Sequence, residues 1–243
     1  MSPIADAFVS AILGTTVLIM LGAGVVATVL LPKSKGFNGG WLLITFGWGF
    51  GVMAGVYVAY KSGGHLNPAV TLGLLVAGID FAKGIDPTVS NMLVYWAGQL
   101  IGAFIGAVVA FLAFKKHFDE EADPVAKLGI FSTGPAIRSY GWNVVTELIG
   151  TFVLVFWVVV SGKTPTQLGP LAVALLIVGI GASLGGPTGY AINPARDLGP
   201  RIAHFILPIK GKGPSDWAYS WVPVVGPLLG GLIGGLAGAW YIG

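Results

Sequence analysis

Long apolar segments alternate with short polar breaks along the whole chain. Segments long enough to cross a bilayer cover about 7–31, 40–60, 90–113, 141–161, 169–186 and 218–241. About 20 apolar residues in a helix span a hydrocarbon core of about 30 Å. The breaks hold glycine, proline and most of the charged residues, as connecting loops do. The pattern predicts an all-α membrane protein with six transmembrane helices.

Two further apolar segments, at about 69–79 and 195–207, are too short to cross a bilayer. Each one follows an Asn-Pro pair. Proline fits the first turn of a helix, where its missing N–H is not needed, and asparagine is a favoured N-cap residue. We therefore expect two re-entrant half-helices that begin at Pro68 and Pro194.

The triplet Asn-Pro-Ala occurs twice, and its copies lie 126 positions apart (193 − 67). The copies comprise Asn67, Pro68 and Ala69 in the first half and Asn193, Pro194 and Ala195 in the second. Two longer stretches repeat in the same order: LGTTVLIML at 13–21 matches IGTFVLVFW at 149–157, and AGQLIGAFIGA at 97–107 matches VGPLLGGLIGG at 225–235. Three landmarks in one order indicate a duplicated architecture.

The duplication also predicts how the two halves are oriented. Each half has three spans, an odd number, so the second half enters the membrane from the opposite side. The broken helices of such inverted repeats meet near the bilayer midplane. We expect a single channel domain over 1–243, built of inverted repeats 1–114 and 139–243 that the charged loop 115–138 joins.

Half-helices that enter from opposite faces bring their N-termini together inside the membrane. Each N-terminus carries a partial positive charge and unpaired N–H groups. Irregular backbone at that depth is tolerated where it lines a watery cavity, so the segments before the two prolines should be extended and line a pore. Its expected polar groups are the carbonyls of Gly63, Gly64, His65, Gly189 and Ala191 and, at the centre, the amide NH2 groups of Asn67 and Asn193. The positive midpoint would repel cations, hydronium included, and suit neutral polar molecules.

Composition agrees with a membrane protein. Of 243 residues, 55% are hydrophobic and only 9% are charged, against roughly 25% charged in soluble domains. The 39 glycines favour close packing of helices in lipid. The net charge of +3 is scattered, so we expect no nucleic-acid partner, and the absence of cysteine rules out disulfides and thiol chemistry.

An enzyme is not indicated. Ser183 and His204 form the one plausible nucleophile–base pair, but GASLG is not a nucleophile elbow. The three histidines differ in context and are far apart in the sequence, so we expect no metal site and no cofactor. An ion-coupled transporter would need paired ionisable groups at the midplane, which Glu147 alone does not supply.

Arg196 lies three residues after Asn193, inside an apolar segment. A charge at that depth is costly and therefore indicates a function. Near the pore mouth, a fixed guanidinium would donate hydrogen bonds to a hydroxyl or carbonyl and repel cations. The alternatives are a structural ion pair with Asp197 or a side chain that snorkels to the interface.

The two Asn-Pro-Ala boxes, the six spans and the stretch GYAINPARDLGPR together resemble the major intrinsic proteins, the aquaporin family, and most of all their glycerol-facilitator branch. The resemblance covers nearly the whole chain. It implies the aquaporin fold, cytoplasmic N- and C-termini, and a homotetramer with one pore per subunit. The distribution of lysine and arginine over the loops favours the opposite orientation by the positive-inside rule, and we give the resemblance precedence.

The resemblance also implies a selectivity filter at the outer constriction. Arg196 corresponds to the filter arginine, and Tyr190 takes a position where glycerol facilitators have phenylalanine. Gly181 takes the small position that water-only channels fill with histidine, and should widen the slot. Trp48 corresponds to the facilitators' tryptophan if the loop before Ser62 lacks one residue; an ungapped register puts Gly47 there. Without the family match, Trp48 and Tyr190 could equally belong to the interfacial belt or the packed core.

Two departures from the family pattern stand out. Tyrosine at position 190 adds a hydroxyl to the constriction, which would narrow it or add a polar contact. The family's buried glutamate is present as Glu147, which we interpret as structural support and not as a proton relay, but Ala11 replaces it in the first half. Unless Thr15, Thr16 or a water molecule substitutes for that carboxylate, the loop over 61–67 should be more mobile than that over 187–193. Asp197, directly after Arg196, is a further family marker.

These features predict a passive channel for glycerol and other small neutral solutes, with water, that excludes ions and protons. Its surroundings would be the lipid bilayer of a prokaryotic plasma membrane, because the termini are short and no targeting signal is evident. Alternatives are a facilitator of protonated lactic acid or other small metabolites, or a mainly water-selective channel. Any lactate flux should fall steeply as the pH rises above the pKa of the acid.

Overall fold

The computed structural model describes residues 2–243, and the regular secondary structure of this part of the chain consists of helices, without a β-strand. The long helices are α1 (Pro3–Leu30), α2 (Gly40–Val58), α4 (Val89–Ala113), α7 (Tyr140–Ser161), α8 (Pro170–Leu184) and α10 (Val222–Ile242). The shorter ones are η1 (Tyr60–Ser62), α3 (Pro68–Val76), α5 (Lys115–Phe118), α6 (Pro124–Phe131) and α9 (Pro194–Ile206). The predicted all-α membrane architecture is confirmed.

Five of the six predicted spans are helices of 19 to 28 residues that are long and apolar enough to cross a membrane: α1, α2, α4, α7 and α10. The sixth, predicted over 169–186, differs. Helix α8 has 15 residues, which at about 1.5 Å per residue is roughly 22 Å, short of a hydrocarbon core of about 30 Å. It ends at Leu184 because the glycines that follow in Gly185-Gly186-Pro187 favour a turn over further helix.

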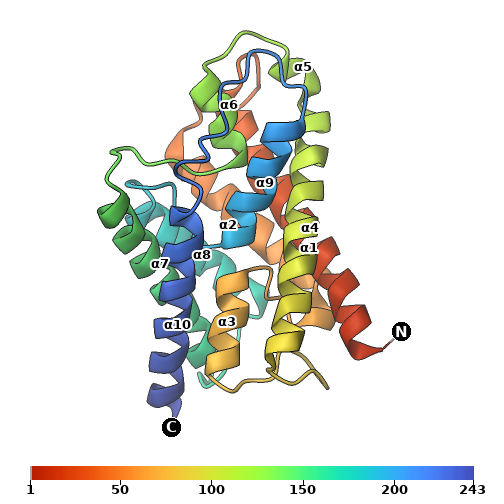
Figure 1. The fold of residues 1–243 in the computed structure, drawn as a ribbon, viewed down its shortest axis with the longest axis vertical. Coiled ribbons are helices and arrows are strands. Elements are labelled where there is room, and N and C mark those ends of the chain that lie inside the picture. The colour runs from red at the N-terminus through yellow and green to blue at the C-terminus, as the bar shows by residue number, and fades with distance from the viewer. Residues whose placement is uncertain (1) are drawn as a thin grey trace.

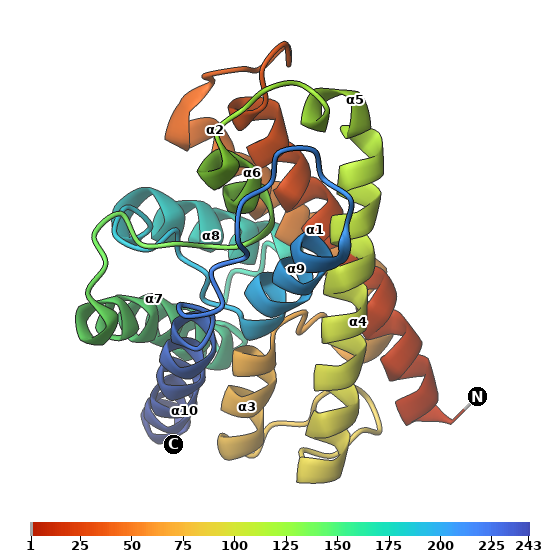
Figure 2. The same ribbon diagram turned by 45° about the horizontal axis from the view of Figure 1, so that its top comes forward.

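The two half-helices are present where the Asn-Pro pairs predict them. Asn67 caps α3 and Asn193 caps α9, each with its side-chain oxygen accepting an N–H of the first turn. The proline that follows each asparagine occupies the first helical position. Figures 1 and 2 show α3 and α9 in the middle of the molecule, between the α1–α4 pair and the α7–α10 pair.

Glycines let the outer helices approach closely. Gly98, Gly102 and Gly106 of α4 face the carbonyls of Phe8, Ile12 and Thr16 on α1. In the second half, Gly226, Gly230 and Gly234 of α10 face the carbonyls of Val144, Leu148 and Phe152 on α7 in the same way. Spacing of four residues puts each trio on one face of its helix, as in small-residue packing within membranes.

The segment 115–138, expected to be a loop, contains the short helices α5 and α6. Helix α6 begins at Pro124 and is capped by Asp123, whose Oδ1 accepts the N–H of Val125. Both helices lie at one end of the molecule, and the N- and C-termini lie at the other (Figure 1).

Candidate functional site

A cavity of about 410 Å³ runs through the middle of the molecule. Its lining extends from Trp48, Tyr190 and Arg196, past Asn67 and Asn193, to the exposed residues 164–169 between α7 and α8. Apolar side chains cover the remaining walls: Leu18, Val52, Val56, Val70, Leu74, Leu154, Val173 and Ile177. The cavity is therefore a long slot with polar groups along one track and hydrocarbon on the other sides.

The two asparagines join the half-helices at the centre of this slot. Asn67 Nδ2 donates to the Ile192 carbonyl at 2.7 Å, and Asn193 Nδ2 donates to the Leu66 carbonyl at 2.9 Å. Each asparagine oxygen caps its own helix at the same time. One hydrogen of each amide is thus used between the halves, which leaves the other for a molecule in the slot.

The loops that lead into the half-helices have an unusual backbone. Leu66, Tyr190 and Ile192 have φ values of 51°, 38° and 43°, a region that costs non-glycine residues about 1–3 kcal/mol. Leu66 and Ile192 each precede an extended asparagine, with φ values of −154° at Asn67 and −158° at Asn193. Of the residues expected to line the pore, Gly63, Gly64, His65 and Ala191 border the cavity, whereas Gly189 does not. Gly189 instead faces Thr133 and donates its N–H to the Gly185 carbonyl.

Glu147 holds the second of these loops. Its two carboxylate oxygens accept the N–H groups of Ala191 at 3.0 Å and Ile192 at 2.8 Å. The carboxylate is 1% exposed and touches the loop from the side opposite the slot. This geometry fits structural support.

The first loop is held differently. His65 Nδ1 lies 3.2 Å from Thr71 Oγ1, and Gln99 Nε2 donates to the same hydroxyl at 3.0 Å. The His65 ring also packs against Phe81 and Tyr95, with centroids 5.4 and 5.0 Å away. A side-chain network therefore fixes the histidine, where a carboxylate fixes the backbone in the other half.

Arg196 and Trp48 meet at one end of the slot. The Arg196 Cζ atom lies 3.9 Å from the centroid of the Trp48 ring, in cation–π stacking geometry. Trp48 in turn packs against Gly22 of α1. Gly47, the alternative from the ungapped register, faces Val25 of α1 and does not border the cavity.

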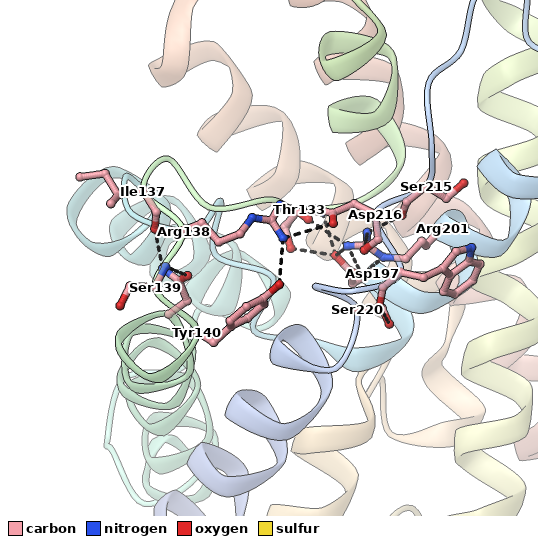
Figure 3. A network of polar contacts seen from close by, with 12 residues as sticks. Thr133, Ile137, Arg138, Ser139, Tyr140, Asp197, Arg201, Ser215, Asp216 and Ser220 are labelled. Carbon is pink, nitrogen blue, oxygen red and sulfur yellow. Dashed lines mark hydrogen bonds and ion pairs between the residues drawn. The ribbon is translucent and has the colours of Figure 1, made fainter.

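The guanidinium of Arg196 is not paired with Asp197, so the alternative of a structural ion pair between these two residues is wrong. Asp197 binds Arg201, with Arg201 Nε to Asp197 Oδ1 at 2.8 Å, and accepts the N–H and hydroxyl of Thr133 at 2.7 Å each. Arg201 also donates to the carbonyls of Thr133 and Ser215 (Figure 3). Asp197 and Arg201 thus tie α9 to two loops and leave Arg196 Nη1 without a protein partner in the described chain.

Gly181 and Tyr190 fit into each other. A Cβ atom on Gly181 would lie 2.7 Å from Tyr190 Cζ and 2.9 Å from its hydroxyl. The phenol ring therefore occupies the space that the glycine leaves, and the expectation that Gly181 simply widens the slot is corrected. Tyr190 is 5% exposed, and its hydroxyl has no hydrogen-bond partner among residues 2–243.

Trp41 is a site residue that the sequence did not predict. Its Nε1 donates to the Gly181 carbonyl at 2.9 Å, and its ring meets Tyr190 edge-on at 5.7 Å. Thr133 was missed as well. A tryptophan at the start of a span is typical of the interfacial belt, and a threonine in a loop carries no signal, so neither pattern could have revealed these contacts.

Comparison with known proteins assigns the chain to a family. The family model of the major intrinsic protein matches residues 2–238. A probable glycerol uptake facilitator protein of Thermotoga maritima is 53% identical over 222 residues, covering 90% of this chain and 92% of that protein. The glycerol uptake facilitator protein of Bacillus subtilis is 54% identical over 223 residues, covering 90% and 79%.

A solved structure agrees with these relatives. The aquaglyceroporin from Plasmodium falciparum superposes with a TM-score of 0.80 at 32% identity, and the match covers 96% of this chain and 94% of that one. The chain therefore belongs to the major intrinsic protein family, a family of passive membrane channels and not of enzymes.

Proposed function

We propose that this protein is a passive channel for glycerol and other small neutral solutes, with water. The observation that carries the proposal is the amphipathic slot: a continuous cavity with backbone carbonyls and asparagine amides on one track and aliphatic side chains on the others. A polyol has one hydroxyl-bearing edge and one hydrocarbon edge, so both can be satisfied together. The relatives named glycerol uptake facilitators and the aquaglyceroporin structure support the same solute class.

Trp48, Gly181, Tyr190 and Arg196 are the proposed selectivity filter. The stacked indole and the phenol supply apolar surface for the carbon backbone of the solute. The unpartnered Nη1 of Arg196 supplies a donor for its hydroxyls. A small solute would lose its hydration shell here and recover hydrogen bonds from these groups.

Ion and proton exclusion follows from charge. The N-termini of α3 and α9 and the guanidinium of Arg196 bring positive potential to the slot. Cations are repelled by it, and a water molecule at the centre accepts hydrogen bonds from the two asparagine amides, which interrupts a proton wire.

The architecture we propose is one channel domain of two inverted repeats, 1–114 and 139–243, in a prokaryotic cell membrane. The matching glycine contacts of α4 on α1 and of α10 on α7 support the repeat. Both ends of the chain lie at one end of the molecule (Figure 1), which supports placing them on the same side of the membrane, and the family resemblance makes that side the cytoplasmic one. Large apolar side chains exposed on the outer helices, such as Leu42, Leu112 and Trp142, support contact with lipid and with neighbouring subunits of a homotetramer.

Blocking the slot tests the proposal. Val56 lines the cavity, while Val58, two residues along the same helix, does not border it and is 39% exposed. In proteoliposomes under a glycerol gradient, light scattering should show fast reswelling for the native chain and for Val58→Trp, and loss of reswelling for Val56→Trp. Equal reswelling of all three proteins would mean that glycerol does not use this slot.

A further inference from the structure

Ala11 stands where the second half of the molecule has Glu147, and the surrounding contacts are the same. A Cβ atom on Gly98 would lie 3.2 Å from the Cβ of Ala11, as one on Gly226 would lie 2.7 Å from the Cβ of Glu147. The first pair joins α1 to α4, and the second joins α7 to α10, which are the first and last long helices of each repeat. The backbone of α1 therefore presents position 11 to the interior much as α7 presents position 147.

The loops in front of these positions also correspond. Leu66 and Ile192, 126 positions apart, both have positive φ, at 51° and 43°. Leu66 packs on Gly14 of α1, and Ile192 packs on Gly150 of α7. Because each of these carbonyls accepts an asparagine amide of the other half, the N–H groups of both loops face away from that contact.

From this equivalence we infer that the N–H groups of His65 and Leu66 face the side chain position of Ala11. Their counterparts, at Ala191 and Ile192, donate to the carboxylate of Glu147. A methyl group cannot accept a hydrogen bond, and the first-half N–H groups have no protein acceptor among the hydrogen bonds of residues 2–243. Two buried donors left unpaired would cost free energy comparable to the bonds they lack.

Two acceptor atoms without hydrogen-bond partners among residues 2–243 lie on α1 and α4, the helices that carry Ala11 and Gly98. Thr15 Oγ1 and Gln99 Oε1 are buried, at 0% exposed for both residues, and neither makes a hydrogen bond in the described chain. Thr15 contacts Gly102, one turn beyond Gly98, and Gln99 reaches the first loop through Thr71. The second half differs at both positions, because Thr151 donates to the Glu147 carbonyl and Pro227 takes the place of Gln99.

We propose that at least one ordered water molecule binds between Ala11 and the first loop, in the place of the missing carboxylate. A water molecule has two acceptor sites for the N–H groups of His65 and Leu66 and two hydrogens for Thr15 Oγ1 and Gln99 Oε1. Buried waters typically make about three hydrogen bonds to polar groups of this kind. The first half-helix loop is thus anchored by a neutral molecule where the second is anchored by a charge.

Solid-state NMR of the full chain in lipid bilayers tests this by water-to-amide magnetisation transfer. Transfer is expected at the His65 and Leu66 amides and not at those of Ala191 and Ile192. Ala11→Glu supplies the carboxylate, and transfer to the two first-loop amides should be lost while signals of other pore-lining residues persist. Their hydrogen exchange should slow by about tenfold or more, the factor expected for a hydrogen bond to a charged acceptor.

A second variant guards against misfolding of Ala11→Glu. Thr15→Val removes one acceptor at nearly constant volume, so transfer to His65 and Leu66 should weaken while the fold is kept. The proposal would be overturned if the native protein showed no magnetisation transfer to these two amides. It would also be overturned if the transfer were unchanged in both variants, because the transfer would then arise from pore water. A change in the NMR chemical shifts of the His65 and Leu66 amides on addition of sodium formate would also overturn it, since the site would then hold an anion.

Discussion

At the scale of residues, the packing of Gly181, Tyr190 and Trp41 bears on the width of the proposed filter. The glycine has no side chain, and the phenol ring of Tyr190 fills the space beside it, held edge-on by Trp41. Trp41 is held in turn by its hydrogen bond to the Gly181 carbonyl. We therefore expect the position of the Tyr190 ring in the proposed filter to depend on all three residues together.

Gly181→Ala tests this coupling. The new methyl group would lie 2.7 Å from Tyr190 Cζ, so the ring must move toward the lumen. A ring displaced into the slot narrows it for the solute, and every increase of about 1.4 kcal/mol in the barrier slows permeation tenfold. Stopped-flow glycerol permeability should fall by about that factor and recover in Gly181→Ala/Tyr190→Leu; a loss that the second substitution does not relieve would contradict the coupling.

Glu147→Gln tests the anchor of the second loop. The glutamine side chain keeps one acceptor oxygen, which can accept the N–H of Ala191 or of Ile192. Its NH2 group faces the other N–H, and because both groups are donors, that hydrogen bond is lost. A buried donor left unpaired costs about 1–3 kcal/mol. Thermal unfolding in detergent should shift to lower temperature by the corresponding amount, while Thr146→Ala, at the preceding position, should leave it nearly unchanged. Equal shifts in both variants would argue against a specific anchor.

The sequence predicted much of the site at this scale. Asn67 and Asn193 as N-caps follow from local chemistry, because Asn-Pro before an apolar turn has few other uses. The supporting role of Glu147 was expected from the family resemblance and not from its local sequence. The fit of Tyr190 into the space at Gly181 could not be predicted, because it depends on a side-chain rotamer chosen by neighbours from other helices. The same holds for the choice of Asp197 between Arg196 and Arg201.

At the scale of elements, both half-helices are held at their N-termini, and α9 is held at its C-terminus as well. Their N-termini are joined by the two asparagines. The C-terminus of α9 is held by Lys212, whose ammonium group donates to the carbonyls of His204, Phe205 and Leu207 at 2.6–2.8 Å. A cation at this end satisfies otherwise unpaired carbonyls and complements the helix dipole.

Helix α6 is held by another lysine, which is buried. Lys127 is 1% exposed and donates to the carbonyls of Phe118 and Glu120 at 3.0 and 3.1 Å. The polar character of 115–138 predicted a loop, because eight- and four-residue helices leave little periodic signal. Lys127 also donates to the carbonyl of Lys210, 83 positions away, so it ties α5 and α6 to the loop after α9.

Lys127 makes stability depend on pH. Burial lowers its pKa, and nearby Lys210 lowers it further. In the unfolded chain the lysine keeps its ordinary pKa of about 10.4, so between the two values the unfolded chain binds more protons and the free energy of unfolding rises with pH. The stability of the native chain relative to Lys127→Met should therefore increase from neutral pH to pH 10 in thermal unfolding. A relative stability that falls over this range would contradict the assignment.

At the scale of the whole molecule, the glycine-lined contacts of α1 with α4 and of α7 with α10 enclose the two half-helices. Hydrophobic pattern and repeat spacing were sufficient to predict the long helices and the two half-helices, but not which helices pack against each other. They were not sufficient for α8, whose apolar pattern continues past the residues that are helical. Periodicity cannot distinguish the end of a helix from apolar loop residues that line a buried turn.

The orientation in the membrane can be measured directly, because the chain has no cysteine. Single cysteines can be introduced at Ser2 and Gly243, at the end with both termini, and at Val125 of α6, which is 74% exposed at the other end. With intact cells, a membrane-impermeant maleimide should label Val125→Cys and leave Ser2→Cys and Gly243→Cys unlabelled until the cells are opened. The reverse pattern would place the termini outside, as the distribution of lysine and arginine suggests.

The central claim is that one slot admits a polyol and refuses protons. The measurement that tests it most directly follows glycerol entry by light scattering and internal pH by a trapped dye in the same proteoliposomes, under a glycerol gradient and a pH gradient. The account predicts reswelling much faster than in empty liposomes, with decay of the pH gradient no faster than in empty liposomes. Water flow without glycerol entry, or glycerol entry accompanied by proton leak, would contradict it.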